Sequence, residues 1–178
     1  MARLPYADPQ THRDSALAER IRAERGDVLH LYAMLLHSTP MTEGWLALFT
    51  AVRHKGVLPG DLRELVIMQV ALLNGAPYEA QQHRPIALRE GLSQEKIDGL
   101  GTWRSVEAYT PRERAVLAYC EQMTRNVHVD DAVFAAVRDH FDDRMMVELT
   151  VTIAGYNMVS RVLEALSVDA SDDKGDWR

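Results

Sequence analysis

The chain of 178 residues is long enough for one domain with a well-filled core, and its 47% hydrophobic and 26% charged residues are ordinary for a globular protein. Its net charge of −6 argues against a nucleic-acid partner, which needs clustered lysine and arginine. A single cysteine, Cys120, excludes an internal disulfide, and no apolar stretch reaches the roughly 18–20 residues of a membrane span. Since the N-terminus also lacks the apolar region of a signal peptide, we expect a soluble, cytoplasmic chain with no membrane partner.

The pattern is helical almost throughout, and we find no convincing strand. We expect an extended arm over residues 1–14, a single all-α domain over 15–168 with about eight to ten helices, and a flexible acidic tail over 169–178. Apolar spacing predicts one helix from Ser15 to near Gly26, a second over about 28–35, and a third that opens at Thr39.

The next predicted helix is the most informative one. Its residues 65–73 are apolar on nearly all sides apart from Gln69, which predicts burial on nearly all sides and a place at the centre of the core. Asp61 and Glu64, three residues apart at its start, have the spacing of a capping box. The pair Asn74-Gly75 ends the helix.

The second half of the chain carries clear helix starts and stops. Pro77 suits the first turn of a helix that runs to about Glu90, and Ser93 is placed to cap a short one. Thr110 followed by Glu113 predicts a capping box. The last helix is predicted from about Asp143 to Leu166.

Four side chains form the best cluster of reactive groups. Glu79 and His83 are four residues apart, so a helix places them on one face, where a carboxylate can hold the tautomer of an imidazole and raise its basicity. Glu64, on the preceding helix, supplies a second carboxylate, and Tyr78 a hydrogen bond to a substrate oxygen. His83, Glu79 and Glu64 are therefore our candidate catalytic residues, and Tyr78 our candidate substrate-binding residue.

Structural interpretations of the same residues stay open. Glu64 alone can close the capping box, while Glu79 and His83 can form a solvated surface pair. A metal site built on Glu79, His83 and Glu64 is disfavoured, because a catalytic zinc usually takes three ligands that include more histidines; His30, His37 and His54 lie on other segments. We therefore expect neither metal nor cofactor.

Two further polar positions have simple structural explanations. Cys120 lies on the apolar side of its helix, which favours an inert buried thiol. Asn157 lies within the last helix and, if it is buried, must find hydrogen-bond partners. It either contributes to a site or cross-links helices.

Several motifs together resemble the carboxymuconolactone decarboxylase family, which includes the AhpD-like alkylhydroperoxidases. The resemblance covers about residues 40–168 and is carried by Leu58-Pro59-Gly60-Asp61-Leu62-Arg63-Glu64-Leu65-Val66, by Asn74-Gly75-Ala76-Pro77-Tyr78-Glu79 with His83, and by Ala87-Leu88-Arg89-Glu90-Gly91-Leu92-Ser93. It implies an AhpD-like helical fold and homo-oligomers, commonly trimers or hexamers.

The resemblance also bears on the chemistry. In the peroxidase branch a Cys-x-x-Cys pair opens the helix that ends in the motif's histidine; here the cysteine positions match Ala76 and Glu79, the histidine matches His83, and the preceding glutamate matches Glu64. Dithiol chemistry therefore does not carry over. The decarboxylase branch implies cofactor-independent proton transfer, decarboxylation or lactone hydrolysis, on a small carboxylated substrate. The alternatives are a thiol peroxidase that relies on Cys120 and a non-enzymatic protein that binds a ligand or a partner.

Overall fold

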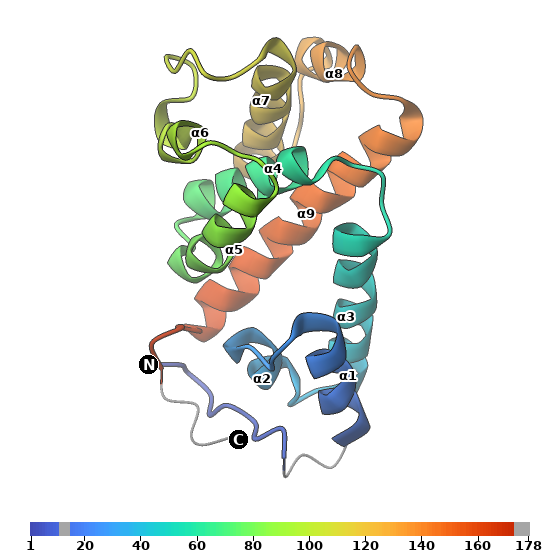
Figure 1. Ribbon diagram of the computed structural model, residues 1–178, viewed down its shortest axis with the longest axis vertical. Coiled ribbons are helices and arrows are strands. Elements are labelled where there is room, and N and C mark those ends of the chain that lie inside the picture. Colours follow the sequence, from blue (N-terminus) through green and yellow to red (C-terminus); the bar gives the residue numbers. More distant parts are fainter. Residues whose placement is uncertain (11–14, 173–178) are drawn as a thin grey trace. The chain divides into compact units, whose positions relative to one another are not determined.

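The structure is a computed structural model that describes residues 1–10 and 15–172. Over these residues the chain forms nine α-helices and one short 3₁₀ helix, with no strand (Figure 1). The predicted all-α class and its helix number are therefore confirmed. Within the same residues, no helix combines the length and the apolar character needed to cross a bilayer.

The described residues fall into two compact units. One contains residues up to Lys55 together with those from Val162 onward, and the other contains Gly56–Arg161. The single domain expected over residues 15–168 stays a prediction.

The first unit contains three helices, α1 (Ser15–Arg25), α2 (His30–Leu35) and α3 (Thr39–His54). Helix α3 packs against both α1 and α2. The N-terminal arm is held by the last described residue, because Asp172 Oδ2 accepts hydrogen bonds from Tyr6 Oη at 2.8 Å and from the backbone N–H of Ala2 at 2.9 Å. The rest of the expected tail, 173–178, and residues 11–14 of the expected arm lie outside the described residues.

Helix α4 (Gly60–Asn74) is the centre of the second unit. It packs against α5 (Pro77–Arg89), α7 (Pro111–Asn126) and the 3₁₀ helix η1 (Leu100–Thr102) (Figure 1). Most of its side chains are buried, namely Leu62, Glu64, Leu65, Val66, Ile67, Met68, Gln69, Val70 and Ala71. Each buried leucine, isoleucine or valine stabilises the fold by about 1.5–3 kcal/mol. The prediction that this helix forms the centre of a core is confirmed.

The remaining helices of the second unit are α6 (Gln94–Asp98), α8 (Asp131–Arg138) and α9 (Asp143–Leu166), whose residues up to Arg161 belong here. Helix α8 packs against α7. Helix α9 meets α7 through a 2.8 Å hydrogen bond between Tyr119 Oη and Thr150 Oγ1. Ser93 accepts a hydrogen bond from the backbone N–H of Lys96, so the predicted cap of α6 is confirmed.

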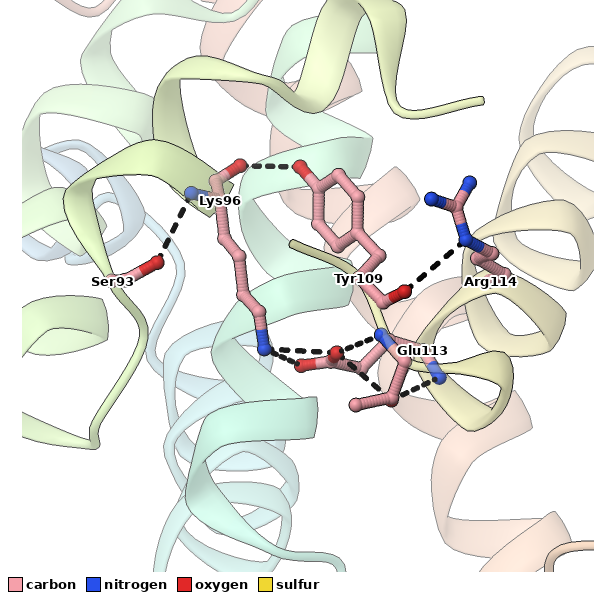
Figure 2. Close-up of polar contacts among 6 residues, drawn as sticks. Ser93, Lys96, Tyr109, Glu113 and Arg114 are labelled. Carbon is pink, nitrogen blue, oxygen red and sulfur yellow. Dashed lines mark hydrogen bonds and ion pairs between the residues drawn. The ribbon is translucent and has the colours of Figure 1, made fainter. Parts of the chain in front are cut away.

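A polar network fixes the connection between α6 and α7 (Figure 2). Thr110 and Glu113 form the predicted capping box at the start of α7. The Glu113 carboxylate also pairs with Lys96 Nζ at 2.7 Å, and Tyr109 Oη donates to the backbone carbonyl of Lys96. Arg114 donates to the backbone carbonyl of Tyr109. The loop before α7 is thereby tied at both of its ends.

Candidate active site

Helix α4 carries Glu64 into the interior. The expected capping box at its start is wrong: the helix begins at Gly60 with Pro59 as the N-cap, and no side chain caps it. The Glu64 side chain is fully buried and is used elsewhere. The physical reason is that a carboxylate one turn into the helix faces the neighbouring helix α5, where a stronger partner is available.

The turn between α4 and α5 determines where α5, the second helix of the site, begins. Gly75 ends α4 in the left-handed conformation, with a φ of 62°, which glycine adopts without strain. Pro77 then occupies the first turn of α5, where its missing N–H costs nothing. The two helices pack together, and α5 buries Tyr78, Glu79 and His83.

His83 is bonded to Glu64. The distance from His83 Nδ1 to Glu64 Oε2 is 2.8 Å, and the imidazole is only 8% exposed. Arg63 supports the carboxylate from the outer side, with its Nε 3.2 Å from Glu64 Oε1 and its Nη2 3.0 Å from Glu90 Oε1. The structure thus joins two predicted site residues and adds Arg63, which the sequence interpretation missed.

These partners decide the charge of Glu64. Burial acts to raise its pKa, but the hydrogen bond and charge of His83, together with Arg63, outweigh burial and hold the pKa of this carboxyl below its usual value. Glu64 is therefore an ionised carboxylate at neutral pH, and it can only accept hydrogen bonds.

Glu79 behaves differently, although it is equally buried, at 1% exposure. Its described partner is not His83 but Ser160, whose Oγ lies 2.5 Å from Glu79 Oε2. Burial raises the pKa of Glu79 to about 8, and the Ser160 hydrogen bond opposes this only in part. Of the two carboxylates considered as partners of His83, Glu64 holds the imidazole, and Glu79 is an uncharged carboxylic acid at neutral pH.

Helix α9 is the third helix that contributes side chains to the site. Its Tyr156 ring lies edge-on to the His83 ring, with centroids 5.1 Å apart and an interplanar angle of 88°. Ser160, one turn further along, reaches Glu79. Two contacts therefore connect α5 to α9 at successive helical turns, one between His83 and Tyr156 and one between Glu79 and Ser160. Tyr156 and Ser160 were not predicted from the sequence. They lie more than 70 positions from His83 and Glu79, and no local motif links residues so far apart.

Three other residues were considered from the sequence, namely Tyr78, Asn157 and Cys120. Tyr78 is 6% exposed, and its substrate-binding role stays a prediction. Asn157 cross-links helices, since its side chain bonds to Asn74 on α4 at 3.1 Å and to Thr124 on α7 at 3.0 Å. Cys120 is fully buried and burial raises the pKa of its thiol to about 12, so the expected burial of this thiol is confirmed.

No metal centre is visible among the residues that the structure describes, where no three His, Cys, Asp or Glu side chains are grouped to hold an ion. His30 and His37 instead bond to the backbone carbonyls of Asp172 and Pro5, at 2.9 and 2.7 Å. The buried groups described above at this site that can carry chemistry are thus the imidazole of His83, the ionised carboxylate of Glu64 and the neutral carboxyl of Glu79.

The described residues form an AhpD-like helical fold. A peroxidase-related protein with an alkylhydroperoxidase AhpD core from Ralstonia eutropha JMP134 superposes with a TM-score of 0.82 over 96% of this chain and 93% of its own, at 20% identity. At that identity the likeness concerns the fold. Position 76 is alanine and position 79 is glutamate, and the chain's one cysteine is Cys120.

Sequence comparison finds similarity to one family and to two bacterial proteins. Residues 40–122 match the sequence model of the carboxymuconolactone decarboxylase family, and this region contains Glu64, Glu79 and His83. YdfG of Bacillus subtilis (strain 168) is 29% identical over 106 residues, which are 58% of this chain and 72% of YdfG. YnjA of Escherichia coli (strain K12) is 27% identical over 138 residues, which are 76% of this chain and 72% of YnjA.

Proposed function

We propose that the chain is a carboxymuconolactone decarboxylase-like enzyme that uses His83 as a general acid–base, held by Glu64, to move protons on a small carboxylated substrate. The reaction is decarboxylation or lactone hydrolysis and requires no cofactor. The match of residues 40–122 to the family supports this class of substrate.

The observation that carries the proposal is the 2.8 Å contact between His83 Nδ1 and Glu64 Oε2. Because an ionised carboxylate only accepts, Nδ1 must carry the hydrogen, and the neutral ring then has its lone pair on Nε2. Nε2 has no hydrogen-bond partner among the described residues, so it is available to take a proton from a substrate. Glu64 stabilises the imidazolium that results.

A test replaces His83 by alanine and assays 4-carboxymuconolactone and related carboxylated lactones for loss of substrate and release of carbon dioxide. We expect turnover to fall by about 10²-fold or more, the range of general acid–base catalysis. His128→Ala, which removes an exposed histidine, is the matched control and should keep wild-type turnover. Circular dichroism and size-exclusion chromatography check fold and assembly, for which we expect a homo-oligomer, a trimer or hexamer.

Two outcomes would remove the proposal. Turnover by folded His83→Ala at the wild-type rate would show that the imidazole is not used. Binding of the lactones without any turnover by the wild-type protein would favour a non-enzymatic ligand-binding role instead.

Thiol peroxidase activity has no support at Cys120. The thiol is fully buried, its raised pKa keeps it protonated, and its Sγ lies 3.8 Å from the backbone carbonyl of Val66. A peroxidatic cysteine must instead be an accessible thiolate.

A further inference from the structure

Glu79 has an unusual environment for a carboxyl group. One oxygen, Oε2, is bonded to Ser160, and the other, Oε1, is buried and has no hydrogen-bond partner among the described residues. Native proteins rarely leave a buried polar atom unpaired, because its desolvation is not offset. The unpaired oxygen therefore points to a ligand that completes it.

The following charged groups on the helices that pack against α5 have partners other than Glu79. On α4, Glu64 is bonded to His83 and Arg63. On α6, Lys96 pairs with Glu113, and Asp98 pairs with Arg84.

No ion pair among the described residues includes Glu79. A carboxyl buried without a cation stays protonated, because ionisation in such surroundings costs several kcal/mol. Tyr156 on α9, which contacts His83, supplies no positive charge to Glu79 either.

A neutral carboxyl carries its proton on one of its two oxygens. Ser160 Oγ is 2.5 Å from Glu79 Oε2 and 3.0 Å from the backbone carbonyl of Tyr156, so the closer contact takes the single hydroxyl hydrogen of Ser160. Oε2 is then an acceptor, and the acidic hydrogen resides on Oε1. The site thus presents an uncharged O–H donor one helical turn from His83, on the same face of α5.

We infer that Glu79 acts as an uncharged carboxylic acid that donates a hydrogen bond to a substrate carbonyl oxygen, and that the substrate is a carbonyl compound with an acidic C–H beside that carbonyl. This inference rests on the proposed role of His83. It gives Glu79 a role separate from holding the imidazole.

The step balances without any co-reactant. The proton leaves the carbon next to the carbonyl for His83 Nε2, the C–H electron pair forms a carbon–carbon double bond, and the carbonyl π pair moves to oxygen. Glu79 Oε1–H stabilises that enolate oxygen by a hydrogen bond and keeps its proton. His83 then delivers its proton to a second carbon of a conjugated enolate, which shifts the double bond, and nothing is oxidised or reduced.

The test uses 2,4-dinitrophenolate, a coloured mimic of an enolate oxygen that stays ionised at pH 7 and above, with binding followed by absorbance. At pH 7 we expect Glu79→Gln, which keeps a donor, to bind within about threefold of wild type. We expect Glu79→Leu, which lacks a donor, to bind at least about tenfold more weakly. The wild-type affinity should fall about tenfold from pH 7 to pH 9 as Glu79 ionises, and that of Glu79→Gln should stay flat.

Ser160→Ala supplies a readout that a purely structural role would not move. Its hydroxyl lowers the pKa of Glu79, so its removal should shift the alkaline loss of binding to higher pH. If Glu79→Leu does not fold, the pH profiles of wild type, Glu79→Gln and Ser160→Ala still decide.

The inference is overturned if folded wild type fails to bind the probe, if its affinity is flat from pH 7 to pH 9, or if Glu79→Leu binds as tightly. The two proposals fail separately. A His83-dependent turnover with no Glu79 effect removes only this inference, whereas a Glu79-dependent profile with normal turnover by His83→Ala removes only the general acid–base role.

Discussion

Replacing Glu79 by glutamine should abolish the pH dependence of stability that this one side chain imposes. Glutamine has the shape of the uncharged acid and can still bond to Ser160, but it cannot ionise. Burial raises the pKa of Glu79 to about 8, from a usual value of 4.5. The folded state therefore holds a proton that the unfolded chain has released over this whole interval.

The sign and size follow from linkage. Where the folded state binds more protons than the unfolded state, the free energy of unfolding falls as pH rises, and the loss is complete above the folded pKa. Between pH 6 and pH 9 the interval from 6 to about 8 contributes, at about 1.4 kcal/mol per pH unit. The wild type should therefore lose about 2.8 kcal/mol relative to Glu79→Gln between these two pH values.

Urea unfolding followed by circular dichroism at pH 6 and pH 9 measures the difference directly. Glu107→Gln, which neutralises an exposed carboxylate, is the control and should track the wild type at both pH values. Thermal melting should show the same effect as a relative shift of about 5–10 °C. Parallel curves for wild type and Glu79→Gln would refute the assignment of Glu79 as a neutral acid.

Three further substitutions test the structure. Glu64→Gln keeps an acceptor for His83 Nδ1 but removes the charge that stabilises an imidazolium, so turnover of a carboxylated lactone should fall by about 10²-fold while Asp61→Asn on the same helix does not change it. Thr110→Ala should cost about 1 kcal/mol in urea unfolding through loss of the α7 cap, and Thr110→Ser should not. Cys120→Ser should leave any peroxide consumption unchanged in a coupled assay, because the thiol is buried and protonated; a loss would restore the peroxidase alternative.

The helices could be predicted because their signals are local. The apolar run 65–73, the stop at Gly75 and the capping box from Thr110 to Glu113 each lie within a few consecutive residues, and the structure places α4 and α7 where these signals predict. Each such signal concerns backbone groups that only neighbouring residues can satisfy. No tertiary knowledge is needed to interpret them.

The site could be predicted only in part. Asp61 and Glu64 have capping-box spacing, and nothing in the local sequence distinguishes a cap from a buried carboxylate whose partner, His83, lies 19 residues away. Ser160 is 81 residues from Glu79, so its contact depends on how α9 packs against α5. The residues expected to carry chemistry were identifiable by type and spacing, but their pairing required the tertiary structure.

The two carboxyl groups of the site show why that pairing decides the chemistry. Glu64 and Glu79 are both almost completely buried, yet the pKa of one is lowered and the pKa of the other is raised. Burial is common to both, so the difference arises from their partners: a guanidinium and an imidazole for Glu64, a hydroxyl for Glu79. Two like groups whose surroundings drive their pKa values apart take different roles, here an ionised acceptor that holds His83 and a neutral hydrogen-bond donor. A thiol at position 79 would be a nucleophile, whereas a neutral carboxyl is a hydrogen-bond donor, and a site built this way favours moving protons over moving electrons.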